Sequence, residues 1–122
     1  LLAVVGGTLL TVAVKDFYER PRPSLVEAAL HLESFSFPSG HAMVSAVTYL
    51  TIGTLLARTQ TRTVIKLYVM SMAVLVTVAV GISRVYLGVH WPTDVMAGWL
   101  AGILWATLVW LAANRLEPVK PT

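Results

Sequence analysis

The hydrophobic residues of this chain form four long stretches, and short polar segments separate them. The stretches cover residues 1–14, with an extension as far as 18, then 39–57, 67–83 and 95–114. The second and third contain no Lys, Arg, Asp or Glu. A helix needs about 20 mostly apolar residues to cross the hydrocarbon of a bilayer. The fourth stretch has this length, and the second and third reach it with their flanks, so the pattern predicts membrane helices.

Strands are the alternative, because Val and Thr are plentiful. A membrane strand alternates apolar and polar residues over about 10 positions. Runs such as Ala-Val-Leu-Val at residues 73–76 do not alternate. No internal repeat or low-complexity linker divides the chain. We therefore predict an all-α fold, a transmembrane bundle of four helices that forms one membrane-embedded domain over residues 1–122.

The composition supports a bilayer environment, since 57% of the residues are hydrophobic and 12% are charged. A soluble domain has about 25% charged residues. The absence of Cys excludes disulfides and thiolate chemistry, and the small, scattered net charge of +3 argues against nucleic acid as a partner. The first residues lack the basic start and the cleavage site of a signal peptide. We therefore expect them to belong to a membrane segment of a longer chain.

Three polar segments connect the stretches, at residues 15–37, 58–66 and 84–94. We expect the first to be a loop with one short interfacial helix and the second to be a tight turn. Successive membrane helices run in opposite directions, so the first and third polar segments lie at the same membrane face. This face gathers the polar residues Lys15, Arg20, Arg22, Ser39, His41, Arg84, His90 and Asp94.

The opposite face keeps the 58–66 turn and the C-terminal tail, which carry five cations and one acidic residue. Loops on the cytoplasmic side of a membrane are enriched in Lys and Arg. If the cations of the first face serve a ligand, the opposite face is cytoplasmic. The gathered residues would then face outward, which in a bacterium means outward from the cytoplasmic (inner) membrane.

Residues 15–23 read Lys-Asp-Phe-Tyr-Glu-Arg-Pro-Arg-Pro. Arg and Lys can neutralise phosphate oxygens, Arg with a planar bidentate fork and Lys as a point charge. The prolines stiffen the backbone on which Arg20 and Arg22 lie. A basic segment that touches lipid headgroups is an equally good interpretation of this segment alone.

Residues 37–41, Phe-Pro-Ser-Gly-His, begin the second helix. Ser39 suits the N-cap position, and Gly40 lets a ligand approach the backbone closely. A helix N-terminus offers N–H groups and a positive dipole end to an anion beside His41. For these residues alone, an ordinary capped helix with an interfacial histidine is the simpler interpretation.

Residues 83–94 hold Ser-Arg, then His90 and Asp94. Asp94 is four residues beyond His90 and comes within its reach if Pro92 begins a new helical turn. A carboxylate that accepts one imidazole N–H fixes the tautomer and leaves the other nitrogen for attack. The alternative is an interfacial histidine with Trp91 as a headgroup anchor.

Taken in order, the three segments resemble the signature of the type 2 phosphatidic-acid phosphatases, the lipid phosphate phosphatase superfamily. That signature has Lys, six residues and Arg-Pro; then Pro-Ser-Gly-His; then Ser-Arg, five residues, His, three residues and Asp. Every spacing matches here, with Lys15, Arg22-Pro23, Pro38-Ser39-Gly40-His41, Ser83-Arg84, His90 and Asp94. Arg20 lies outside the signature, and we assign it no core role.

The resemblance implies that His90 attacks phosphorus to form a phosphohistidine, with Asp94 orienting it. His41 would protonate the leaving group and then activate water. No metal or other cofactor is implied, and the partners are the lipid phosphate substrate and membrane lipids. The family fold has six membrane helices with the signature on the last four, so we expect two more before this chain. The expected phosphate-binding residues are Lys15, Arg22, Ser39, Gly40 and Arg84.

Several alternatives remain open at this stage. The same site would serve a lipid phosphotransferase, and a non-catalytic lipid-binding homologue would share the fold. A haloperoxidase would use the pocket for vanadate, although those relatives are typically soluble. A zinc site of His31, His41, His90 and Asp94 is disfavoured, because Arg and Lys surround the histidines. The lipid stays open among phosphatidic acid, phosphatidylglycerol phosphate, undecaprenyl diphosphate and sphingoid phosphates, as does the oligomeric state.

Two further features of the chain have structural interpretations. Gly98 and Gly102 form a small-xxx-small pair, which we expect to allow close packing inside the bundle rather than dimerisation. The four Trp residues are expected to be interfacial anchors or bulk, without a catalytic part.

Overall fold

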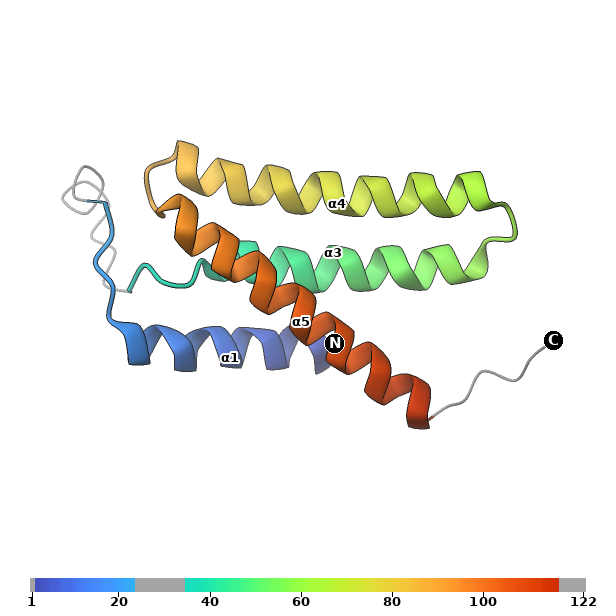
Figure 1. The fold of residues 1–122 in the computed structure, drawn as a ribbon, viewed down its shortest axis with the longest axis horizontal. Helices are drawn as coiled ribbons and strands as arrows, with labels where there is room; N and C mark the ends of the chain where they lie inside the picture. Colours follow the sequence, from blue (N-terminus) through green and yellow to red (C-terminus); the bar gives the residue numbers. More distant parts are fainter. Residues whose placement is uncertain (1, 24–34, 117–122) are drawn as a thin grey trace.

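The computed structural model describes residues 2–23 and 35–116. The described chain contains four helices, α1 (Leu2–Tyr18), α3 (Gly40–Thr59), α4 (Thr63–Tyr86) and α5 (Pro92–Leu116), and no strand. In Figure 1, α1, α3 and α4 lie roughly side by side, and α5 crosses them at an angle. The predicted all-α helical bundle is confirmed.

Three helices extend beyond their apolar stretches: α3 ends two residues later, and α4 and α5 are longer at both ends. α4 begins at Thr63 and ends at Tyr86, where the pattern predicted 67–83, so the turn between α3 and α4 is only residues 60–62. Long Arg and Lys side chains can extend past the apolar core of a helix toward water, and charged ends therefore do not stop a membrane helix. α1 ends at Tyr18, which is the limit of the extension that the pattern predicted. One short interfacial helix was expected somewhere within 15–37, and residues 24–34 of this segment lie outside the described residues.

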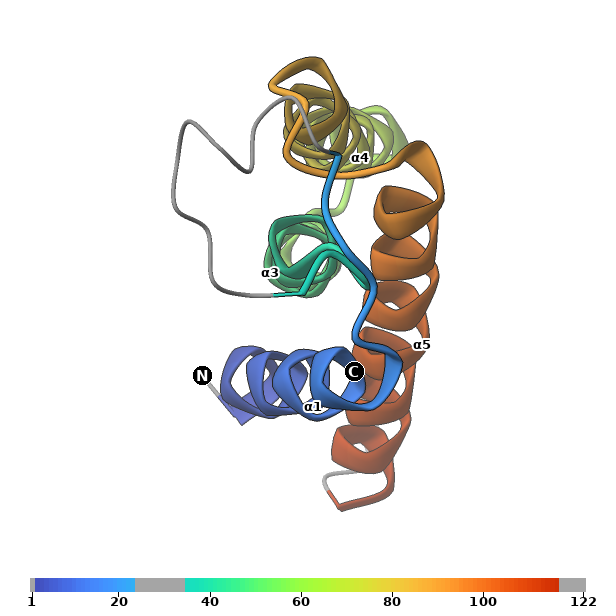
Figure 2. The same cartoon turned by 90° about the vertical axis from the view of Figure 1, so that its left-hand side faces the viewer.

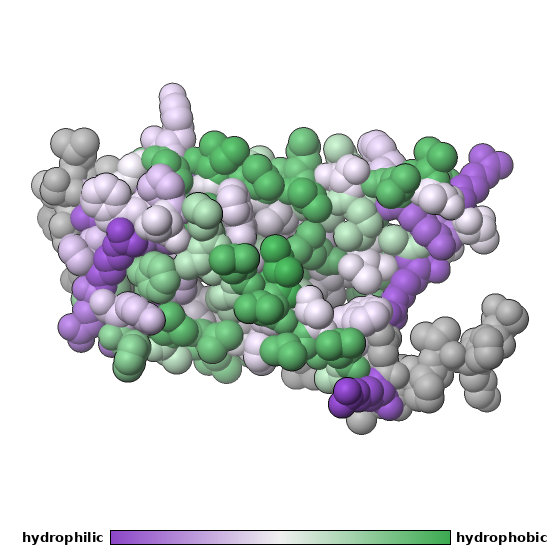
Figure 3. All heavy atoms as spheres, in the orientation of Figure 1, coloured by the Kyte–Doolittle hydropathy of each residue, from purple (hydrophilic) through white to green (hydrophobic). Residues whose placement is uncertain are grey.

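The surface of the bundle is that of a membrane protein. By length and composition, α3, α4 and most of α5 are apolar enough to cross a bilayer, whereas the 17 described residues of α1 are fewer than that criterion requires. Large hydrophobic side chains point outward along the helices, including Leu9, Leu75 and Leu104, each at least 60% exposed. Figure 3 shows hydrophobic residues over the middle and hydrophilic residues toward the two ends. The chain is an integral membrane protein.

Small residues let α5 cross close to α3. A Cβ atom at Gly98 would lie 2.6 Å from the Ser39 carbonyl oxygen, and one at Gly102 would lie 2.7 Å from the Met43 carbonyl oxygen. Both distances are too short for any side chain, so the glycines set the separation of the two helices. The expectation that the pair packs within the bundle is confirmed, and this packing holds the N-terminal half of α5 against α3.

Three connecting segments meet at one end of the bundle. Figure 2 views this end and shows residues 19–23, in blue, running across it from α1 toward α4. The segments before α3 and between α4 and α5 lie at the same end (Figure 1). The segments that carry the three motifs therefore share one face, as the alternating direction of the helices predicted.

Candidate active site

The C-terminus of α4 determines where His90 lies. Gly88 adopts a left-handed backbone conformation, with φ of 67°. Its N–H donates to the Val85 carbonyl at 2.9 Å, and the Val89 N–H donates to the Arg84 carbonyl at 3.2 Å. This is the Schellman arrangement that ends many helices, and glycine adopts the required φ at low cost. The reversal places His90 just beyond the last turn of α4, which carries Arg84.

The N-terminus of α5 brings Asp94 back toward His90. Pro92 is the first residue of the helix, a position that suits proline because its missing N–H needs no partner there. The Asp94 carboxylate accepts the Trp91 N–H at 2.9 Å, as an acidic residue at the third helical position often does. Asp94 Oδ2 lies 3.6 Å from His90 Nδ1, and both side chains are buried. The predicted helical turn at Pro92 is confirmed.

Asp94 has two further partners that the sequence analysis missed. The Arg20 Nη1 donates to Asp94 Oδ1 at 2.8 Å, although we had assigned Arg20 no core role. The Ser36 hydroxyl donates a short hydrogen bond to Asp94 Oδ2. These contacts join residues 74 and 58 positions apart, and no spacing motif connects them. Only the fold shows that Arg20 and Ser36 meet this carboxylate.

Ser39 caps α3 as the sequence predicted. Its side-chain oxygen accepts the Ala42 N–H at 3.4 Å, and its own N–H donates to the Asp94 carbonyl at 2.9 Å. The residue is completely buried and does not line the pocket, whereas Gly40 and His41 do. The expectation that Ser39 also binds phosphate stays a prediction, and the contact seen here is a cap that orients the first turn of α3.

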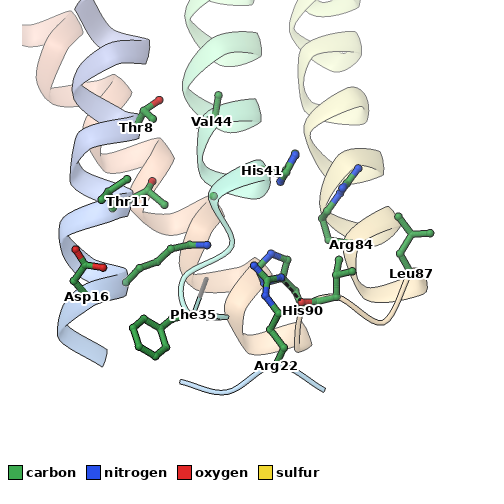
Figure 4. A pocket seen from close by; sticks show the side chains of 14 residues that line it. Thr8, Thr11, Asp16, Arg22, Phe35, His41, Val44, Arg84, Leu87 and His90 are labelled. Carbon is green, nitrogen blue, oxygen red and sulfur yellow. Dashed lines mark hydrogen bonds between the residues drawn. The ribbon is translucent and has the colours of Figure 1, made fainter. Parts of the chain in front are cut away.

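A cavity of ≈ 990 Å³ opens where the three motifs meet. Figure 4 shows His41 on α3, Arg84 on α4, and His90 and Arg22 on connecting segments, pointing toward a common space. Arg22 is held there by donating from Nη1 to the Val89 carbonyl at 2.9 Å. The cationic pocket, as we call it, is the part of this cavity formed by Lys15, Arg22, Gly40, His41, Arg84 and His90.

The remaining walls of the cavity are largely apolar. They include Val12 of α1, Val44 of α3 and Leu87 after α4. The exposed Asp16 is the single acidic residue among the described residues that line the cavity. An arrangement of three cations above an apolar wall suits an amphiphilic anion.

The surroundings of His90 keep its imidazole neutral. Burial is the main reason why its pKa is lowered, and the positive charges of Arg22 and Lys15 lower it further. Asp94 and the backbone of Ser36 act in the opposite direction without compensating, and the pKa of His90 falls to about 4. A neutral imidazole is the form that can act as a nucleophile.

The described residues do not gather metal ligands. Within 2–23 and 35–116, no group of three or more His, Cys, Asp or Glu side chains is arranged to hold a metal ion. His31, a member of the alternative zinc site, lies outside the described residues. The groups that line the cationic pocket would bind an anion and repel a metal cation.

The fold and the site together define a class: a helical membrane protein in which a buried His–Asp pair borders a pocket of Arg and Lys. Residues 1–118 match the PAP2 superfamily. The chain therefore belongs to this superfamily, which confirms the resemblance that the three motifs indicated.

Relatives and solved structures agree with this assignment. The chain is 43% identical over 112 residues to phosphatidylglycerophosphatase B of Bacillus subtilis, covering 89% of this chain and 55% of the relative. It is 35% identical over 86 residues to the undecaprenyl-diphosphatase of Sulfolobus acidocaldarius, covering 70% of this chain and 37% of the relative. This chain thus spans about half or less of the length of these relatives.

The crystal structure of a transmembrane PAP2-type phosphatidylglycerolphosphate phosphatase from Bacillus subtilis has a TM-score of 0.87 and 38% identity. It matches 98% of this chain, which covers 59% of that structure. The crystal structure of LpxE from Aquifex aeolicus has a TM-score of 0.67 and 30% identity, and the match covers 90% of this chain and 64% of that structure.

Proposed function

We propose that this chain carries the active site of an integral-membrane phosphatase that hydrolyses the terminal phosphate of a lipid phosphate or diphosphate. The placement of His90 is the observation that carries the proposal. Its Nδ1 faces the buried carboxylate of Asp94, and its ring lines the cationic pocket. In this proposal, residues 1–122 form a single membrane-embedded domain.

The first step forms a phosphohistidine. With Nδ1 turned toward Asp94, the neutral Nε2 of His90 attacks phosphorus and forms a P–N bond. The P–O bond to the lipid breaks, or, in a diphosphate, the bond to the lipid monophosphate. His41 gives its proton to the leaving oxygen, as a general acid.

The second step releases phosphate. Water attacks the phosphohistidine, His41 takes a proton from that water, and the P–N bond breaks. His90 returns to its neutral form and His41 to its cationic form. Two histidines with opposite protonation states at the start can therefore complete the cycle without a metal.

The cations of the pocket stabilise the charge that develops on the phosphoryl oxygens. Lys15, Arg22 and Arg84 come from three different parts of the chain and line one cavity. Groups fixed in advance around a transferring phosphoryl group are the main source of catalysis in such reactions. Gly40 adds the N–H groups of the first turn of α3, and Ser39 keeps that turn oriented.

Phosphatidylglycerol phosphate, undecaprenyl diphosphate and phosphatidic acid are the substrates that we expect. The names of the relatives support the first two, and the apolar wall of the cavity supports a lipid. We expect a bacterial cytoplasmic membrane, and the cations at the far end of the bundle, among them Arg58 and Lys66, support an orientation with the site facing outward.

The test is phosphate release from these three lipids by the full-length protein in detergent, with EDTA present. Release by the wild type and none by His90→Ala is the expected result. His31→Ala is the matched control and should keep its activity. No release by the wild type would overturn the proposal, and a phosphorylated lipid product in place of phosphate would favour the phosphotransferase.

A further inference from the structure

We propose that Arg20 is a positioning residue for this reaction, which fixes the Asp94 carboxylate against His90 and does not bind the substrate. The proposal rests on the proposed function, since it assigns a part in the same site. It concerns a residue that lies outside the three-motif signature.

The carboxylate of Asp94 is completely buried, and a buried charge is costly unless it is paired and hydrogen-bonded. Arg20 donates to Oδ1 at 2.8 Å, while the Trp91 N–H and the Ser36 hydroxyl donate to Oδ2. Arg20 is therefore the cation that directly pairs with this carboxylate in the described structure.

Arg20 is itself fixed in place. Its Nη1 also donates to the Thr93 hydroxyl at 2.8 Å, and its guanidinium carbon lies 5.8 Å from the centre of the Trp91 ring. Its carbonyl accepts the Ser36 N–H at 2.8 Å. Arg20 thus joins the segment after α1, the segment before α3 and the first turn of α5 around one carboxylate.

Arg20 and Arg22 have different targets although only one residue separates them. Arg22 lines the cationic pocket, and Arg20 does not. The Arg20 guanidinium binds the Asp94 carboxylate, on the side of His90 away from the cationic pocket. Its loss should therefore disturb the nucleophile more than the binding of the lipid.

The charges around His90 define what the loss of Arg20 changes. His90 is faced by Lys15 of α1 and by Arg22 on the following segment. Asp94 of α5 lies behind its ring. His41 of α3 and Arg84 of α4 line the same pocket. Without Arg20, the negative charge of Asp94 is less compensated and stabilises a protonated His90 more strongly.

The experiment compares Arg20→Gln, Asp94→Asn and the double variant in the full-length protein, with Arg62→Gln as a matched control at the far end of the bundle. Arg20→Gln should lower kcat roughly 10- to 100-fold with a much smaller change in KM. The acid limb of its kcat/KM profile should move upward by about one pH unit. Arg20→Lys should recover part of the activity, because an ammonium can still pair with Oδ1.

The double variant gives the sharpest result. If Arg20 acts through Asp94, Arg20→Gln should add little to the loss already caused by Asp94→Asn. The proposal would be overturned if Arg20→Gln lowered kcat by the same factor in the wild type and in Asp94→Asn. A rise in KM alone, or unchanged kinetics, would also overturn it. If Arg20→Gln does not fold, Arg20→Lys and Thr93→Val support the same comparison. An inactive wild type would instead contradict the proposed function itself.

Discussion

His90 Nδ1 and Asp94 Oδ2 lie 3.6 Å apart, inside the part of the protein where both side chains are almost fully buried. The separation is longer than a hydrogen bond between these atoms. Catalytic hydrogen bonds are often long in a free enzyme and shorten when the substrate is bound. In the proposed mechanism, this pair orients the nucleophile.

Asp94→Asn should lower kcat by roughly 100- to 10,000-fold, because an amide does not hold the tautomer of His90 or stabilise its charge. The helix should survive, since the amide oxygen of Asn can still accept the Trp91 N–H. Steady-state kinetics and thermal unfolding in detergent measure the two effects. A variant that unfolds at a much lower temperature would show that Asp94 serves mainly as a cap of α5.

The acid limb of kcat/KM should lie near pH 4 when binding and folding are unchanged. Because the pKa of His90 is lowered to about 4, the imidazole stays neutral until the pH falls to that value. Protonation below it removes the nucleophile, so activity should fall as the pH decreases. Initial rates from acidic to neutral pH test this. An acid limb near the ordinary histidine pKa of about 6.5 would show that the surroundings of His90 do not lower its pKa.

Arg22→Gln and Arg84→Gln should each weaken inhibition by vanadate and lower kcat/KM by at least about 10-fold, because each removes a cation from the phosphoryl group. Lys66→Gln is the control, since Lys66 lies at the opposite end of the bundle and is exposed. Inhibition constants measured in the same detergent compare the variants. Equal inhibition of wild type and Arg22→Gln would place the phosphate elsewhere.

Gly98→Ala should destabilise the protein by roughly 1–3 kcal/mol, as overpacking does in a close-packed interior. The added Cβ would lie 2.6 Å from a backbone oxygen of Ser39, so α5 has to move and Asp94 moves with it. Activity should fall together with the unfolding temperature. Ala112→Val, on an exposed part of the same helix, should change neither, and stability of Gly98→Ala equal to wild type would refute the packing argument.

Much of this site follows from the sequence because it depends on local signals. The apolar stretches predict the helices, and their alternating direction brings Lys15, His41 and His90 to one face. Pro92 predicts the helical turn that returns Asp94 to His90, and Ser39 predicts the cap of α3. Each of these inferences uses residues only a few positions apart or the direction of a whole helix.

The remaining features depend on contacts that no local pattern encodes. Arg20 and Ser36 reach Asp94 from distant positions in the chain, and their roles appear only when the three segments are folded together. The predicted ends of α4 were wrong, because the helix continues through polar residues such as Thr63 and Arg84. Hydropathy marks the apolar middle of such a helix, whereas the hydrogen bonds at Gly88 set its end.

The most direct test of the account is to trap the intermediate. The full-length protein is mixed with a lipid substrate labelled in its terminal phosphate, quenched within milliseconds under alkaline conditions that preserve phosphohistidine, and mapped by mass spectrometry. The account predicts a phosphoryl group on His90 of the wild type and none in His90→Ala. A phosphoryl group on another residue, or rapid phosphate release without any phosphoenzyme, would contradict it.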